Sequence, residues 1–324
     1  MEKLLIICGP TATGKTALGI YLAKKFNGEI VSADSRQVYR GMDIGTGKDI
    51  KSGKWVARGK GGHWQVKGVS LWLIDVVNPE ERFTTADYLE LAGKTIKTIR
   101  GRGKLPIIVG GTGLYIRSLI DGIETLGILP DWELRWRLKA LPVQGLFAML
   151  AQLDPERVAT MNASDRKNPR RLIRAIEITQ ADADSRRDFK LSYKRETIDS
   201  LLIGLRAPME SLYQRIDRRV EERVKQRIKQ EIEKLLEKGY TWESSAMGET
   251  LGYQEWRLFF GGEKTEKEVI QRWQFNEHGY ARRQMTWFKK DKRINWLDIT
   301  KFGWKKAVVK LTREWYSEKN AKKD

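Results

Sequence analysis

The fold is decided by residues 4–16, which read Leu4-Leu5-Ile6-Ile7-Cys8-Gly9-Pro10-Thr11-Ala12-Thr13-Gly14-Lys15-Thr16. A short apolar run ends in a glycine, and Gly-Lys-Thr follows after four intervening residues. Apolar residues at helical spacing come next, on one face, until Asn27-Gly28 ends the pattern. A strand, a glycine-rich loop and a helix in this order are the signature of a P-loop, a turn that binds phosphate groups.

The chemistry of phosphate binding explains this spacing. Gly9 and Gly14 let the backbone curl so that successive N–H groups point inward, and the helix that follows adds the positive end of its dipole. Lys15 would reach the outer phosphates, and the Thr16 hydroxyl would hold Mg²⁺. We therefore predict a site for a di- or triphosphate, built from eight consecutive residues: Gly9, Pro10, Thr11, Ala12, Thr13, Gly14, Lys15 and Thr16.

The composition points to a polyanionic partner. The net charge is +19 and the isoelectric point is about 9.8, and so large a basic excess suggests nucleic acid first. One cysteine, Cys8, and two histidines exclude a disulfide framework and a zinc finger. No apolar run approaches the roughly 20 residues that span a membrane, and the apolar start is too short for a signal peptide. We expect a cytoplasmic protein that binds no membrane.

Strand-like apolar runs alternate with helical patterns in the first part of the chain. After the first run, further strands are expected at residues 29–33, 71–77, 105–109 and 201–205. The glycine-rich, basic segment 52–68 reads as a mobile loop or a hairpin. The alternation breaks after Gly122, where short, charged, helical patterns begin. We predict an α/β fold: a P-loop NTPase-like parallel sheet flanked by helices, formed by residues 1–123 and 198–324, with a helical insertion domain at 124–197.

Three features at expected strand ends could belong to the phosphate site. Asp34 directly follows the second strand and would be a general base, a metal ligand or a helix cap. Asp75, inside the expected strand 71–77, fits either a Walker B carboxylate near Mg²⁺ or a structural role. The turn at 110–113 (Gly-Gly-Thr-Gly) would either approach the P-loop or be a tight turn without a ligand.

Two segments in the C-terminal half combine basic residues with a helical pattern. Apolar residues recur at every fourth position from Leu212 to Ile232, beside arginines at 215, 219, 223 and 227. Both stripes are expected to wind around one helix, because a spacing of four exceeds the helical 3.6; the alternative is an exposed charged face. Residues 280–290 interleave basic and aromatic side chains, which suits RNA phosphates and an unstacked base, or a surface helix with Trp287 and Phe288 packed inward.

Taken together, these segments resemble tRNA dimethylallyltransferases, the isopentenyl transferases that prenylate an adenosine of the anticodon loop. The motifs that carry the resemblance are 9–16 (Gly-Pro-Thr-Ala-Thr-Gly-Lys-Thr), 32–46 (beginning Ser-Ala-Asp-Ser-Arg-Gln), 109–115 (Val-Gly-Gly-Thr-Gly-Leu-Tyr), 171–177 (Arg-Leu-Ile-Arg-Ala-Ile-Glu), 212–220, 252–255 (Gly-Tyr-Gln-Glu) and 281–288 (Ala-Arg-Arg-Gln-Met-Thr-Trp-Phe). The resemblance runs from Gly9 to about Lys290. The sequence departs from the family pattern at Gly47-Lys48-Asp49, at Leu71-Trp72 and at His278.

The resemblance implies a reaction and a set of roles. The P-loop, with Lys15 and Mg²⁺ on Thr16, would hold the diphosphate of dimethylallyl diphosphate rather than ATP. Asp34 would be the general base, and Arg219 and Arg215 would face the diphosphate. Contacts with the tRNA anticodon stem-loop are expected from Asp34, Ser35, Arg36, Gln37, Thr112, Arg170, Arg171, Leu172, Ile173, Arg174, Arg282 and Arg283.

Three other functions are weighed against this one. A P-loop kinase of a small molecule or nucleoside explains residues 9–16 but leaves the charge and residues 281–288 unused. An adenylate isopentenyltransferase would not need the basic insertion, and a non-enzymatic RNA-binding protein would not need Lys15 together with Asp34. A tRNA-directed prenyltransferase, acting as a monomer, uses all of these features.

Overall fold

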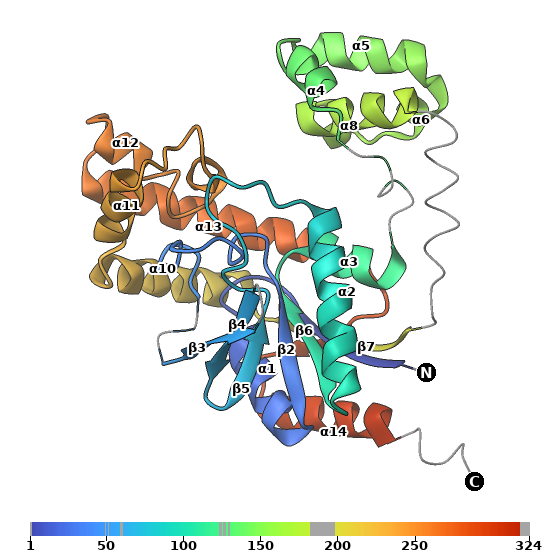
Figure 1. Cartoon of the computed structure of the whole chain (residues 1–324), viewed down its shortest axis with the longest axis vertical. Coiled ribbons are helices and arrows are strands. Elements are labelled where there is room, and N and C mark those ends of the chain that lie inside the picture. The colour runs from blue at the N-terminus through green and yellow to red at the C-terminus, as the bar shows by residue number, and fades with distance from the viewer. Residues whose placement is uncertain are drawn as a thin grey trace. The chain divides into compact units, whose positions relative to one another are not determined.

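The computed structural model describes residues 2–48, 50, 52–58, 61–122, 125, 128, 130–181 and 198–317. The chain divides into two compact units (Figure 1): Met1–Asp121 with Thr197–Asp324, and Gly122–Glu196. The sequence-based insertion, 124–197, has nearly the same limits as the second unit, although its last part, 182–197, lies outside the described residues. Each unit has a core of its own.

The larger unit is built on one mixed sheet. In the described part of the chain it has eight strands, in the spatial order β3 (Lys54–Arg58), β4 (Gly61–Val66), β5 (Val69–Trp72), β2 (Gly28–Ala33), β6 (Leu105–Gly110), β1 (Glu2–Cys8), β7 (Ile198–Arg206) and β8 (Asn295–Asp298). All pairs from β5 to β8 are parallel, and β3 and β4 add an antiparallel hairpin at one edge. The predicted parallel sheet is therefore confirmed for the centre, and segment 52–68 contains the hairpin.

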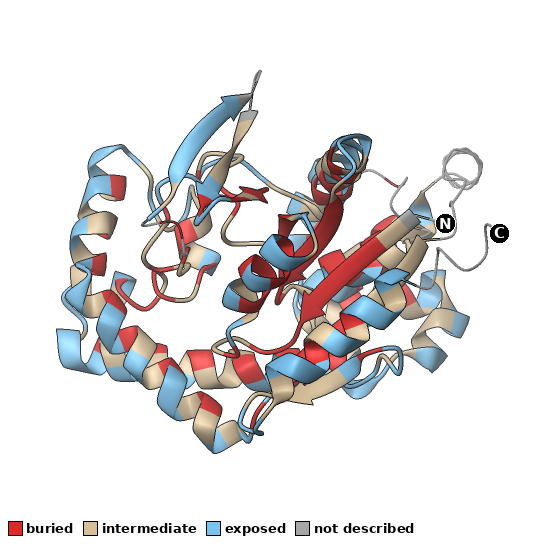
Figure 2. Ribbon diagram, turned by 90° about the horizontal axis from the view of Figure 1, so that it is seen from below, coloured by how far each residue is buried: buried red, intermediate tan, exposed pale blue. Residues whose placement is uncertain are grey.

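The first strand lies at the middle of this sheet. Leu5 of β1 is in register with Ile107 of β6 on one side and with Leu201 of β7 on the other. Residues 4–8 are fully buried, so both faces of the strand are covered. This explains why the strand reads as an unbroken apolar run rather than as an alternation. The central strands are accordingly red in Figure 2, whereas the hairpin is largely exposed.

Helices cover the two faces of the sheet. Those of the larger unit are α1 (Lys15–Lys25), α2 (Thr85–Gly101), α3 (Gly113–Asp121), α10 (Met209–Lys225), α11 (Ile228–Glu237), the 3₁₀ helix η1 (Ala246–Glu249), α12 (Arg257–Phe260), α13 (Glu266–Phe288) and α14 (Trp304–Ser317). Helix α1 connects β1 to β2 and α2 connects β5 to β6, in opposite directions along the sheet. Because such crossovers are right-handed, α1 and α2 pack on opposite faces.

One sequence-based prediction is wrong: residues 212–232 do not form one helix. Helix α10 ends at Lys225, and Arg227 adopts a left-handed conformation (φ +72°) before α11 begins. An unbroken helix would carry a four-residue repeat about 40° further round with each step. The break resets that rotation, so Val220 and Ile228, from different helices, are buried in the same cluster.

The smaller unit consists of helices in its described part: α4 (Trp132–Lys139), α5 (Val143–Leu153), α6 (Pro155–Thr160), α7 (Ala163–Arg166) and α8 (Pro169–Gln180). Their core is formed by Leu134, Leu138, Leu146, Leu150, Leu172, Ala175 and Ile176. Among the residues that the structure describes, in either unit, every helix is too short or too polar to span a lipid bilayer.

Candidate active site

The P-loop begins where β1 ends. Gly9 has φ +126°, and a Cβ there would lie 2.3 Å from the carbonyl oxygen of Leu205, so this position accepts only glycine. Gly14 (φ +82°) precedes the first residue of α1 and turns the chain into that helix. The free N–H groups of the first turn of α1 and the positive end of its dipole therefore lie at the loop, as an anion site requires.

The charged group of the loop is held within the loop itself. Lys15 Nζ donates to the Pro10 carbonyl oxygen at 2.7 Å, and the Thr13 hydroxyl donates to the same oxygen at 2.8 Å. Burial lowers the pKa of Lys15 to about 8; the Asp34 carboxylate opposes this shift, and the Arg219 charge adds to it. Near neutral pH the ammonium group is charged but poorly compensated, which favours an incoming anion.

Arg219 lies against the loop. From α10, its guanidinium donates to Thr11 Oγ1 at 2.6 Å, and it forms an ion pair with Glu277 of α13 at 3.4 Å. Its Nε is buried without a hydrogen-bond partner. A second carboxylate oxygen of Glu277 accepts from the buried Arg223 at 3.1 Å. Arg215, one turn earlier on α10, is exposed.

Asp34 follows β2 at the same edge of the sheet as the P-loop. Its Oδ1 accepts the backbone N–H groups of Arg36 at 2.9 Å and Gln37 at 3.4 Å. The next loop along the sheet, after β6, is tied to it: the Ser35 N–H donates to Thr112 Oγ1 at 3.0 Å, and the Thr112 N–H donates to the Ala33 carbonyl at 3.1 Å. The structure thus brings Thr112 beside the Asp34 loop.

The rest of the predicted segment 34–37 is held by more distant partners. Arg36 pairs with Glu249 at 3.8 Å, and the Gln37 amide donates to the Gly47 carbonyl at 3.3 Å. Tyr280 of α13, which was not singled out from the sequence, lies near Asp34. Burial raises the pKa of Tyr280 well above its ordinary value, and the Asp34 charge adds to the shift, so its phenol stays protonated.

Two polar residues of α13 reach this edge and were also missed by the sequence analysis. They are Glu277, described above, and Gln284, whose amide oxygen accepts from the Thr11 N–H at 2.8 Å and whose amide nitrogen donates to the Gly111 carbonyl at 2.9 Å. A signal was present, because Glu277 interrupts an apolar series at every fourth residue from Val269, and Gln284 lies two turns after it. The structure shows that this buried face carries a carboxylate and an amide.

Comparison with known proteins places this chain in a family. A family model for IPP transferases matches residues 37–291, and a model for isopentenyl transferases matches residues 2–54. A tRNA dimethylallyltransferase of Roseiflexus sp. (strain RS-1) is 38% identical over 97% of this chain and 99% of its own length. This chain belongs to that family. The resemblance predicted from the motifs is confirmed.

Solved structures agree with the assignment. The tRNA isopentenylpyrophosphate transferase of Bacillus halodurans is 34% identical, with 99% of each chain covered and a TM-score of 0.70. A eukaryotic dimethylallyltransferase described as acting on tRNA is 23% identical over 98% of this chain and 80% of its own, with a TM-score of 0.78, and supports the fold alone. The P-loop NTPase-like fold is therefore confirmed, and membership of a family of prenyltransferases weighs against the kinase alternative.

One expectation drawn from this family needs correction. Leu172 was expected to contact tRNA, but its side chain is completely buried in the core of the smaller unit. Within the same segment Arg171 pairs with Asp165, and Arg174 donates to the carbonyl oxygens of Thr125 and Ile128. Helix α8 must turn its apolar face inward, so only its other face can meet RNA.

That other face carries Arg170, which is exposed, whereas Ile173 packs partly against the core. On α13 both predicted arginines are exposed. Arg282 donates to the Tyr213 hydroxyl at 2.8 Å, and Arg283 lies over the Tyr280 ring at 5.9 Å. Trp287 and Phe288 of the same helix pack inward, half-buried and buried respectively.

Two departures from the family pattern, at Lys48 and at Leu71-Trp72, can be examined in the structure. Lys48 is buried and contacts Asp75, whose other oxygen accepts from the Trp64 indole at 2.7 Å; this favours a structural role for Asp75 over a Walker B role. Leu73 and Asp75 have positive φ values, so the strand ends at Trp72 and not at Val77. Asp49 lies outside the described residues.

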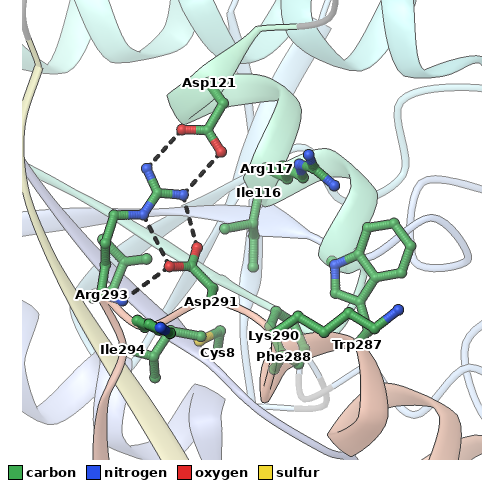
Figure 3. Close-up of a pocket in the computed structure, with 13 residues that line it drawn as sticks. Cys8, Ile116, Arg117, Asp121, Trp287, Phe288, Lys290, Asp291, Arg293 and Ile294 are labelled. Atoms are coloured by element: carbon green, nitrogen blue, oxygen red, sulfur yellow. Dashed lines mark hydrogen bonds and ion pairs between the residues drawn. The ribbon is translucent and has the colours of Figure 1, made fainter.

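A cavity of about 370 Å³ lies beside the site, between α3, the end of α13 and the loop that follows it (Figure 3). Arg293 closes one side, where its guanidinium donates hydrogen bonds to the carboxylates of Asp121 and Asp291. Cys8 borders the cavity, and burial raises the pKa of its thiol to about 12, which makes it a poor nucleophile. The exposed cations Arg117 and Lys290 also line it.

The described residues offer no dedicated protein cage for a metal. No group of three or more His, Cys, Asp or Glu side chains among them could hold an ion. The Thr16 hydroxyl, on the first turn of α1, remains the candidate ligand. This fits Mg²⁺, which prefers one or two protein oxygens together with substrate phosphates and water.

Proposed function

We propose that this chain transfers a dimethylallyl group from dimethylallyl diphosphate to the exocyclic N6 of the adenosine on the 3′ side of the tRNA anticodon. One observation carries the proposal: the P-loop (residues 9–16) with Lys15, and Arg219 of α10 against it, forms an anion cradle at the edge of the sheet where the Asp34 carboxylate also lies. Phosphate binding alone would need only the cradle. Transfer of a prenyl group to a nucleobase needs the cradle and the carboxylate of Asp34.

The cradle acts on the leaving group. As the allylic C–O bond breaks, negative charge grows on the departing diphosphate. The ammonium of Lys15, the guanidinium of Arg219 and the N-terminus of α1 are aimed at that charge, and such preorganised groups are worth most where water is excluded. Mg²⁺, held by the Thr16 hydroxyl and the substrate, would neutralise diphosphate charge. Arg215 would contribute from the exposed turn before Arg219.

The carboxylate acts on the nucleophile. An adenine N6 is a weak nucleophile because its lone pair is delocalised into the ring. Its bond to carbon forms while its proton passes to Asp34, a type of assistance typically worth about 10²–10⁴-fold. Two backbone N–H groups hold Oδ1, which leaves Oδ2 to accept the proton. The base must leave its stack to reach this position, next to Thr112.

The RNA would be gripped by both units. The insertion, 124–197, would contact the anticodon stem-loop through Arg170, and the core would contact it through Arg282 and Arg283, all of which are exposed. The net charge of +19 favours association with the phosphate backbone. We further propose that the protein acts in the cytoplasm as a monomer.

The test is an assay with labelled dimethylallyl diphosphate, Mg²⁺ and either unmodified tRNA or AMP. Label in tRNA supports the proposal. Label in AMP identifies an adenylate isopentenyltransferase, and phosphoryl transfer from ATP without labelling identifies a kinase. Salt-sensitive tRNA binding without turnover identifies a binding protein.

The variant Asp34→Asn separates the roles of Asp34. Asparagine retains an oxygen that can accept the Arg36 N–H but cannot take a proton from N6. Turnover should fall by about 10²–10⁴-fold while tRNA affinity stays unchanged. Loss of tRNA binding together with turnover would instead assign Asp34 to the structure of its loop.

A further inference from the structure

Gln284 joins two loops that are distant in the sequence. Its side chain is only 6% exposed, and both ends of its amide are used, the oxygen by the Thr11 N–H and the nitrogen by the Gly111 carbonyl. Because an N–H can only donate and a carbonyl can only accept, one orientation of the amide satisfies both partners. The contact is therefore a directional link between the loop after β1 and the loop after β6.

These two loops carry different halves of the proposed reaction. Thr11 lies in the diphosphate cradle, and its hydroxyl also accepts from Arg219. Gly111 is followed by Thr112, whose hydroxyl accepts the N–H of Ser35, next to Asp34. A continuous series of hydrogen bonds thus runs from the cradle through Gln284 to the loop of the general base.

The side-chain amide of Gln284 is closely packed between the two loops. A Cβ at Gly111 would lie 2.2 Å from the Gln284 amide nitrogen, so the backbone of the second glycine turn touches the amide directly. Thr11 is held on its N–H by Gln284 and on its hydroxyl by Arg219. Arg219 is in turn paired with Glu277, seven residues before Gln284 on the same helix. Helix α13 therefore holds the cradle at two points.

We propose that Gln284 is a positioning residue that sets the separation between the diphosphate cradle and the Asp34 carboxylate; this rests on the proposed function. Neither substrate needs to touch it. Reacting groups must be held about 3–3.5 Å apart, and a misplacement near 1 Å lowers rates by about 10²-fold. If the separation between the cradle and Asp34 increased, the cradle would still bind diphosphate. The allylic carbon would then react less often with N6 and more often with water.

The experiment compares two replacements of similar length in the full chain. Gln284→Met removes both hydrogen bonds, and Gln284→Glu keeps the acceptor for the Thr11 N–H but loses the donor to Gly111. The control is Asn276→Leu, which removes an amide of the same helix whose hydrogen bond, 2.8 Å long, leads to Glu255 and away from both loops. Each variant is characterised by kcat for tRNA prenylation, by titration with inorganic diphosphate and with tRNA, and by the ratio of diphosphate released to prenyl groups transferred.

The expected result is a split between binding and chemistry. Gln284→Met should lower kcat by about 10–100-fold, with both affinities within about threefold of wild type and more diphosphate released per prenyl group transferred. Gln284→Glu should fall between Gln284→Met and wild type in kcat, and Asn276→Leu should keep the wild-type ratio.

Two results would overturn the inference. One is an unchanged kcat and release ratio in Gln284→Met. The other is a loss of activity that appears only as weaker diphosphate binding, or a loss of kcat that Asn276→Leu reproduces, since either would make the contact merely structural. A wild-type protein that does not prenylate tRNA would overturn the proposed function as well, whereas an active wild type with a normal Gln284→Met overturns this inference alone.

Discussion

Replacement of Glu277 tests the electrostatics behind the P-loop. Its carboxylate is 6% exposed and binds two guanidinium groups, that of Arg223, equally buried, and that of Arg219, which is 30% exposed. Glu277→Gln keeps the shape and one acceptor oxygen but removes the negative charge between two cations. We expect this variant to be much less stable than wild type and to have a changed affinity for diphosphate.

The structure gives the size of the effect. Burial lowers the pKa of Arg223 to about 10 from 12.5, even though Glu277 opposes the shift. The lowered pKa means that the buried charge is unfavourable even with its partner present. Breaking a buried pair by removing one partner destabilises proteins by about 3–5 kcal/mol, so Glu277→Gln should fall in that range. Arg223→Met should be far milder, because the charge with the burial penalty disappears and Glu277 keeps Arg219.

The assay is urea unfolding at pH 7, followed by circular dichroism, for both single variants and the double variant Arg223→Met/Glu277→Gln. The order of stability should be wild type and Arg223→Met highest, the double variant next, and Glu277→Gln lowest. The double variant should recover about 2 kcal/mol or more relative to Glu277→Gln, because it no longer buries an unpaired guanidinium.

The reasoning fails if the two single variants are equally stable, or if removal of Arg223 gives no recovery in the Glu277→Gln background. Either outcome would mean that water or another group compensates the Arg223 charge, and that Glu277 acts through packing alone. A variant pair at Lys94 and Glu90, an exposed pair on α2, provides the control and should change stability by less than about 1 kcal/mol.

Three further predictions follow from the site. Diphosphate binding to the RNA-free protein, measured by calorimetric titration, should weaken as pH rises through 8, because Lys15 then loses its proton. The affinity of Lys15→Arg should depend less on pH. The same lowered pKa makes the free energy of unfolding rise between pH 8 and 10.5, because the folded state releases the proton first. Gly111→Ala should lower kcat as Gln284→Met does, since its Cβ would displace the amide of Gln284. Leu172→Ala should destabilise the smaller unit by about 2–5 kcal/mol in proteolysis assays, whereas Arg170→Ala should lower tRNA affinity and its salt dependence without that loss.

The parts of the site that could be predicted from sequence are the parts that neighbouring residues determine. Gly9 and Gly14 are required by backbone geometry within the P-loop, and Asp34 follows from the position at which a strand ends. The parallel sheet then brings the ends of β1, β6 and β2 to one edge, because these strands are neighbours. Local rules and one topological rule are enough to place the P-loop near Asp34.

The parts that could not be predicted depend on contacts between distant residues. The break at Arg227 is not encoded by glycine or proline, and the series of apolar residues continues across it, so a single helix was the natural expectation. Leu172 sits in a basic stretch, but the amphipathic packing of α8 decides that it faces inward. In both cases the tertiary packing of an apolar face overrides the local pattern.

The distance between the P-loop and the loops that carry Thr112 and Asp34 depends on helix α13. Glu277 and Gln284 are seven residues apart on α13, which places them on one face and about 10 Å apart along the axis. One holds Arg219 at the cradle and the other ties the cradle to the second glycine turn. A helix is stiffer than the loops it contacts, so it fixes a separation that those loops could not maintain by themselves. The precision of the site thus depends on a segment more than 250 residues from the P-loop in the sequence, where no phosphate-binding motif would direct attention.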